Sequence, residues 1–163
     1  MARAESDTRV RVVEERRERL VAGLNGRFTP DSTAAILEQW ERFKTPPPGT
    51  PGVIPGAWYG VCHNYRADGG FEYLCGVEYM DASRVPPGTA RLILPAIRYA
   101  AVHHRGHVSA VTESWRYMYD CWLPAHREWR LAEGPRFELY GPGFDPETGQ
   151  GGFEIWFPVE AAG

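Results

Sequence analysis

The order of predicted elements repeats along this chain, and this repetition constrains the fold more than any single motif. Apolar alternation and turn residues indicate strands at residues 10–14, 20–28, 58–65 and 71–80, with a helix between the second and third. A second series has strands at residues 90–95, 98–105, 137–140 and 153–159, again with a helix between the second and third. The repetition predicts an α+β fold built from two strand-strand-helix-strand-strand units related by a pseudo-twofold axis.

Two such units are expected to form a curved antiparallel sheet with a helix on each half and a central ligand groove. A groove between two halves is a favoured position for a small-molecule site. The length of 163 residues suits a single domain. We predict a flexible tail at residues 1–8 and one domain at 9–163, with half-repeats of about 9–82 and 88–160.

The sequence gives start and stop signals for both helices. Thr29 can cap the first helix, Pro30 suits its first position, and Trp40 and Phe43 continue its apolar face. Four prolines between residues 45 and 52 end this helix and predict a semi-rigid connector or a lid. The second helix is expected at about residues 108–121.

Charge and hydropathy exclude several classes of function. The net charge of −3 gives no electrostatic basis for binding nucleic acid or an anionic membrane. No apolar run reaches the ~18 residues of a membrane span, and no apolar signal segment follows the N-terminus. The three cysteines have no CxxC spacing, which favours reduced thiols and a cytoplasmic protein. We therefore expect no direct DNA binding and no membrane association, in a monomer or a homodimer.

Several short segments, in order and spacing, resemble one known family. They are Trp58–Cys62 (WYGVC), Gly76–Tyr79 (GVEY), Pro95–Ala100 (PAIRYA), Phe137–Tyr140 (FELY) and Phe153–Val159 (FEIWFPV). Together they are similar to the gyrase-inhibitor-like (GyrI-like) small-molecule-binding domain, the module that also forms the effector-binding domain of multidrug-sensing transcription regulators. The resemblance covers about residues 9–160.

The resemblance implies a two-half fold with a central groove that binds cationic, often amphipathic, organic compounds. Some members are fused to DNA-binding domains, some stand alone and protect against toxins, and a subset hydrolyses cyclopropane-bearing alkylating natural products. No helix-turn-helix segment precedes residue 9, so the expectation is a stand-alone binding domain.

Glu138 is the first candidate for a functional side chain, because the resemblance matches it to the pocket carboxylate of the family. Strand alternation puts Phe137 and Leu139 on one face and Glu138 and Tyr140 on the other. If the apolar face meets the helices, Glu138 faces the groove, where a cationic ligand would offset the cost of burying the carboxylate. The alternative is an exposed glutamate on an edge strand.

The other candidates are mainly aromatic. Trp156 and Glu154 share a face of the last strand and are expected to line the groove, with the indole ring suited to cation–π contact. Further ligand-binding candidates come from two other strands and the second helix: Tyr59, His63, Tyr73, Trp115, Tyr119 and Trp122. Each of these faces is either a pocket wall or ordinary core.

Three functions stay open at this point. The first is the binding of a hydrophobic or cationic small molecule for sensing, sequestration or toxin resistance. The second is hydrolysis of an electrophilic cyclopropane compound, with Glu138 or Glu154 as general base on water. The third is engagement of a macromolecule such as gyrase. His103, His104 and His107 have no carboxylate or cysteine at metal-binding spacing, so we predict no metal and no other cofactor.

Overall fold

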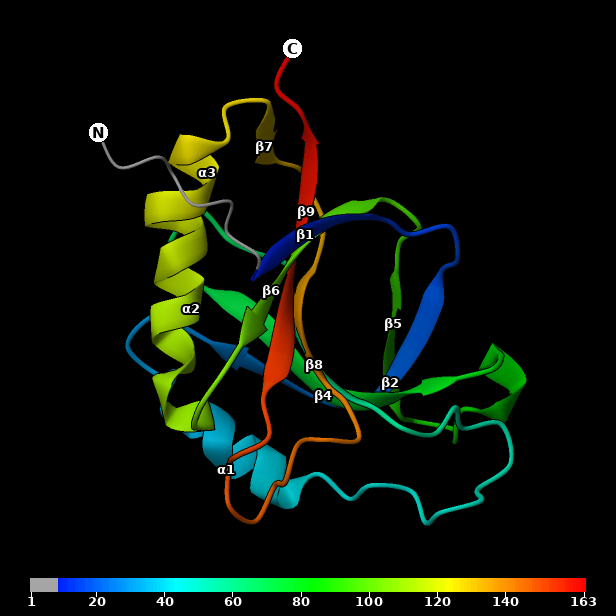
Figure 1. Ribbon diagram of the computed structural model, residues 1–163. Helices are drawn as coiled ribbons and strands as arrows, with labels where there is room; N and C mark the ends of the chain where they lie inside the picture. The colour runs from blue at the N-terminus through cyan, green and yellow to red at the C-terminus, as the bar shows by residue number, and fades with distance from the viewer. Residues whose placement is uncertain (1–8) are drawn as a thin grey trace.

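Nine strands form one curved antiparallel sheet in the computed structural model, which describes residues 9–163 (Figure 1). The strands are β1 (Val10–Glu14), β2 (Arg19–Phe28), β3 (Trp58–His63), β4 (Phe71–Tyr79), β5 (Ala90–Leu94), β6 (Arg98–His104), β7 (Trp129–Leu131), β8 (Arg136–Tyr140) and β9 (Phe153–Ala161). The predicted α+β class with a curved antiparallel sheet is therefore confirmed. The predicted tail at residues 1–8 lies outside the described residues.

The order of strands in the sheet is symmetric about its centre. It runs β1-β6-β9-β8-β3-β4-β2-β5, so β1 to β4 of the first half correspond to β5, β6, β8 and β9 of the second. The first strand of each half pairs with the other half, because β1 lies beside β6 and β5 lies beside β2. The halves meet directly at the β3–β8 pair. Strand β7, which extends the sheet beside β9, was not predicted from the sequence.

Both helical segments differ from their predicted bounds. Helix α1 (Ala35–Arg42) begins after the predicted cap at Thr29, because Thr29 and Ser32 form a separate hydrogen-bonded turn. The second segment runs further than predicted. It consists of η2 (Val108–Ala110), α2 (Val111–Tyr117), the π-helical turn η3 (Met118–Trp122) and α3 (Leu123–Ala125). A short 3₁₀ turn, η1 (Ala82–Arg84), follows β4.

One buried polar side chain docks each helical segment onto the sheet. The Gln39 amide of α1 donates to the carbonyl oxygens of Leu24 (2.9 Å) and Tyr73 (2.8 Å). In the second half, His104 of β6 bonds Ser114 Oγ through Nδ1 (2.6 Å) and the His107 carbonyl oxygen through Nε2 (3.0 Å). Because buried polar groups need partners, these bonds fix where each helix sits.

Both faces of the sheet are buried. Figure 1 shows α1 and α2 on the same side of the sheet. The sheet curls away from these helices, so that its β2–β5 end faces its β1–β6 end. The inner face that this curl encloses carries its own core: Val21, Tyr59, Val61, Leu74, Leu94, Tyr99, Ala101, Phe137 and Trp156. Two further clusters, around Tyr73 and around Phe157, pack beneath α1 and α2. Alternate residues of a central strand therefore enter two different apolar layers.

Strands β2 and β4 approach each other closely at Gly23, which pairs with Gly76. A Cβ atom on Gly23 would lie 1.9 Å from the carbonyl oxygen of Cys75 and 2.7 Å from Gly76 Cα. Backbone atoms in the middle of a sheet cannot move aside without loss of the ladder, so only glycine fits at this position.

We predict that Gly23→Ala lowers the free energy of unfolding by about 3 kcal/mol, the upper part of the range for overpacked sites. Urea unfolding measures the change. The matched control is Gly141→Ala, since a Cβ there meets no atom within 4 Å. Equal stability of the two variants would contradict the close approach of β2 and β4.

Candidate functional site

Glu138 lies at the middle of β8 and is 7% exposed. It pairs with Gly60 on β3 and with Ile155 on β9, which puts its side chain on the face that the helices cover. Gly60 matters for this placement. A Cβ there would lie 2.0 Å from the Tyr73 hydroxyl and 2.8 Å from Glu138 Oε1. Because Gly60 has no side chain, the Tyr73 hydroxyl has room to reach the Glu138 carboxylate.

The Glu138 carboxylate accepts three hydrogen bonds, all from neutral donors. The hydroxyls of Tyr73 (2.7 Å) and Tyr140 (3.1 Å) donate to Oε1, and the indole nitrogen of Trp115 donates to Oε2 (3.3 Å). Within residues 9–163 no arginine, lysine or histidine forms an ion pair with this carboxylate. The site is therefore a buried carboxyl group held by uncharged donors.

Burial controls protonation at this site. Loss of hydration raises the pKa of Glu138, although the three donors and the nearby His104 offset part of the rise. Burial also raises the pKa of Tyr73 and Tyr140 well above the ordinary value, and the negative charge of Glu138 adds to the effect. Both hydroxyls consequently keep their protons and remain donors.

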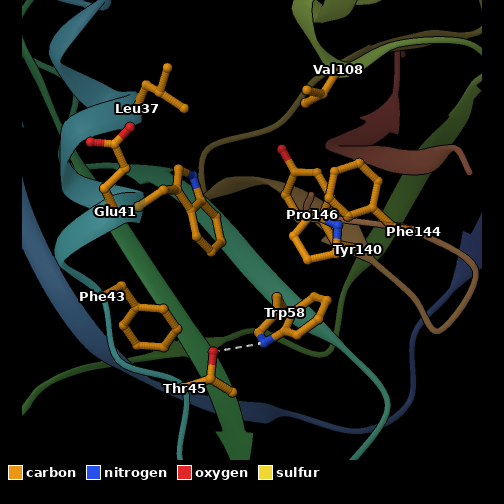
Figure 2. Close-up of a pocket in the computed structure, with 10 residues that line it drawn as sticks. Leu37, Glu41, Phe43, Thr45, Trp58, Val108, Tyr140, Phe144 and Pro146 are labelled. Atoms are coloured by element: carbon orange, nitrogen blue, oxygen red, sulfur yellow. Dashed lines mark hydrogen bonds between the residues drawn. The ribbon is translucent and has the colours of Figure 1, made fainter. Parts of the chain in front are cut away.

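An aromatic cavity of about 380 Å³ lies next to Glu138, between α1, the ends of β3 and β8, and the loop before β9 (Figure 2). Half of its lining residues are aromatic: Leu37, Trp40, Glu41, Phe43, Thr45, Trp58, Val108, Tyr140, Phe144 and Pro146. Glu41 is the one charged side chain among them and is exposed. Thr45, at the start of the proline-containing connector, accepts a hydrogen bond from the indole nitrogen of Trp58 (3.2 Å).

Two side chains link this aromatic cavity to the buried carboxylate. The Tyr140 ring lines the cavity, 5.6 Å from the Trp40 ring and 4.8 Å from the Phe144 ring, while its hydroxyl bonds Glu138. Trp40 also lines the cavity, and its indole nitrogen donates to the Tyr73 hydroxyl (3.0 Å), which in turn donates to Glu138. The cavity and the carboxylate therefore form one connected site.

Three of the predicted ligand-binding residues, Tyr73, Tyr140 and Trp115, contact Glu138 directly. Tyr119 stacks beside Trp115, with ring centroids 6.5 Å apart, and its hydroxyl accepts a hydrogen bond from Arg136. Trp122 stacks on His126 at 4.5 Å within the core beneath the helix and makes no hydrogen bond to Glu138.

The predicted placement of Trp156 and Glu154 in the same groove as Glu138 is wrong. Residues paired directly across two strands share a face, and Trp156 pairs with Phe137 whereas Glu154 pairs with Leu139. Trp156 stacks on Phe137 at 5.3 Å in the inner core. Glu154 instead forms an ion pair with Arg11.

Tyr59 and His63 also lie on the face opposite Glu138. Tyr59 pairs with Leu139, and its hydroxyl accepts from Arg19 (3.1 Å) and donates to Glu78 (3.3 Å). His63 Nε2 bonds the Asn25 side chain at 2.9 Å. The sequence prediction assumed that the apolar residues of β8 meet the helices, but the helices cover the face that carries the carboxylate.

Sequence reasoning missed most of the aromatic cavity. Trp40 and Phe43 appeared as ordinary core positions of a helix, and Phe144 fell in a segment that reads only as a turn. The alternation of β3 did contain one usable signal. Trp58 is two residues before Gly60, so both face the layer of Glu138.

The curved sheet, the aromatic cavity and the buried carboxylate together define a small-molecule-binding α+β domain. Residues 10–160 match the GyrI-like small molecule binding domain, and the chain belongs to this family. The fold and the family predicted from the sequence motifs agree with this match.

The chain is 30% identical over 126 residues to the transcriptional regulator BrlR of Pseudomonas aeruginosa. That alignment covers 76% of this chain but only 46% of BrlR, so the chain spans less than half of this relative.

Solved structures share the fold at lower identity. SAV2435 bound to tetraphenylphosphonium is 18% identical, with a TM-score of 0.70 and 93% of each chain covered. A hydrolase from Listeria innocua is 11% identical, with a TM-score of 0.54, over 93% of this chain and 92% of its own. Across residues 9–163, every helix is too short or too polar to span a bilayer.

We predict that Glu138→Gln changes how stability depends on pH. Because the folded-state pKa is raised above the ordinary value of 4.5, the stabilisation linked to this group is complete at low pH and is lost as the pH rises through the folded-state pKa. Wild-type protein should therefore lose stability relative to the variant as the pH rises from about 4.5 through the folded-state pKa. Urea unfolding across this range measures the difference, and a difference that stays constant or changes in the opposite direction would contradict the burial of an ionisable carboxyl.

Proposed function

We propose that this protein binds hydrophobic organic cations, with the charge of the ligand directed toward Glu138. The observation that carries the proposal is the buried carboxylate, which accepts hydrogen bonds from Tyr73, Tyr140 and Trp115 and lacks a cationic partner among residues 9–163. A buried anion without a counter-charge is costly, and a cationic ligand offsets that cost.

The surroundings of the carboxylate suit a cation that is also apolar. Five rings line the adjacent cavity: Trp40, Phe43, Trp58, Tyr140 and Phe144. Aromatic faces attract cations, by about 0.5–2 kcal/mol per contact depending on desolvation. Apolar ligand surface adds about 25 cal/mol for each Å² removed from water. The cavity volume of about 380 Å³ falls within the range of small-molecule pockets.

Tyr140 is the point at which ligand and carboxylate would meet. Its ring forms part of the cavity wall, and its hydroxyl occupies one position on Glu138 Oε1. A cation in the cavity would therefore attract the Glu138 carboxylate across the Tyr140 ring alone. If that ring rotates, the cation contacts the carboxylate directly. Glu41 at the cavity rim adds a second negative charge that favours entry of a cation.

Two relatives support the proposal. SAV2435, which shares the fold, was solved with the lipophilic cation tetraphenylphosphonium bound. BrlR, which shares 30% identity with this chain, is a transcriptional regulator. Binding of an organic cation would serve as a signal in a protein of that kind, or would sequester a toxic compound.

Titration calorimetry with tetraphenylphosphonium tests the proposal. We expect saturable binding with one site, and Glu138→Gln should weaken it at least about tenfold because the charge of a buried partner is removed. Glu154→Gln is the matched control and should bind as the wild type does, because Glu154 lies on the opposite face in an ion pair with Arg11. Triphenylphosphine oxide, a neutral compound with similar rings, should bind more weakly than the cation.

Equal affinity of wild type and Glu138→Gln, or equal affinity for the cation and the neutral compound, would overturn the role of the carboxylate. The hydrolase alternative is tested in the same series by mass spectrometry of a cyclopropane-bearing electrophile after incubation. Consumption of many equivalents by the wild type, abolished in Glu138→Gln, would establish hydrolysis with Glu138 as a catalytic residue.

A further inference from the structure

A second cavity, of about 560 Å³, lies between the end of β3 and the loop that joins β7 to β8. Residues 131–135 form one side of it, and His63, Tyr65 and Arg136 contribute from the sheet and the following loop. None of these residues lines the aromatic cavity beside Glu138. The cation-binding proposal makes no use of this second cavity.

Arg136 is the cationic group of the second cavity, and aromatic rings hold its guanidinium in place. The guanidinium carbon lies 4.5 Å from the centre of the Tyr65 ring and 5.4 Å from that of Tyr119. Nη1 donates to the Tyr119 hydroxyl. These contacts orient the guanidinium plane but supply no negative charge.

No acidic side chain in the part of the chain that the structure describes pairs with Arg136. Its Nε is buried and has no hydrogen-bond acceptor. Arg19 also has a buried Nε without an acceptor, but its Nη2 bonds Glu15 at 2.7 Å. Arg136 therefore differs from Arg19 in lacking an anion, which is the costly state for a partly buried charge.

We propose that the second cavity binds an organic monocarboxylate through Arg136. Nη1 donates to Tyr119 and Nε is buried, so Nη2 is the guanidinium nitrogen that a ligand in the cavity reaches. Its N–H groups can donate a charge-assisted hydrogen bond to a carboxylate oxygen. A carboxylate at Nη2 supplies the negative charge that the described residues do not.

Two neighbours narrow the class of ligand. Tyr65 is 45% exposed and presents its ring beside the guanidinium, which favours a carboxylate carried on a flat aromatic body. Glu133, which also lines the cavity, is exposed and repels a second negative charge, so a monocarboxylate is favoured over a phosphate dianion. Burial lowers the pKa of His63, which keeps this ring uncharged near neutral pH. Arg136 is thus the group that recognises the anion.

Nuclear magnetic resonance of ¹⁵N-labelled protein tests this proposal with benzoate as the probe. Benzoate should shift the Nε–H signal of Arg136 in a saturable manner, whereas the neutral benzyl alcohol should not. In calorimetry, Arg136→Gln should weaken benzoate binding at least tenfold. Arg136→Lys, which keeps the charge but loses the planar guanidinium that lies over the Tyr65 ring, should also weaken it. Arg105→Gln, at an exposed position, is the control and should bind benzoate as the wild type does.

Tetraphenylphosphonium binding serves as the folding check, since the Arg136 variants should retain it. A benzoate titration of the wild type that leaves the Arg136 Nε–H signal unmoved would overturn the proposal, even if the variants did not fold. Unchanged benzoate affinity in a folded Arg136→Gln protein would overturn it as well. Failure of tetraphenylphosphonium to bind wild-type protein would instead count against the aromatic cavity alone.

Discussion

The burial of one carboxylate among uncharged donors is the constraint on which the rest of the site depends. Glu138 needs three donors in a layer that is mostly apolar, and they come from β4, β8 and α2. Gly60 supplies the space in which the Tyr73 hydroxyl reaches the carboxylate. Without Glu138, the side chains of Tyr73, Tyr140 and Trp115 would be ordinary aromatic core residues. With it, their polar atoms all donate to one buried carboxylate.

The site also requires both halves of the fold. Tyr73, Gly60 and Trp40 belong to the first half, whereas Glu138, Tyr140 and Trp115 belong to the second, and they meet across the central β3–β8 pair. The exchange of first strands, with β1 beside β6 and β5 beside β2, ties the halves together at both ends of the sheet. A fixed junction keeps the donors preorganised around the carboxylate.

Strand alternation predicted the positions of eight strands, because each is long enough to show a period of two. The same alternation could not say which face of β8 meets the helices, because Phe137 and Ile155 are equally apolar on opposite faces of a sheet buried on both sides. This ambiguity placed Glu138 on the same face as Trp156 and Glu154, whereas it lies on the opposite one. The three residues of β7 are too few to show a period of two. Phe144 lies in a loop, and only the course of that loop in the folded protein brings its ring to the cavity.

The most direct test of this account is the titration of the Glu138 carboxyl itself, followed by ¹³C resonance in the free protein and with tetraphenylphosphonium bound. The account predicts a pKa raised above the ordinary value of 4.5 in the free protein, and a lower pKa once the cation is bound. A carboxyl that titrates at its ordinary value in the free protein, or a pKa that the bound cation leaves unchanged, would contradict it.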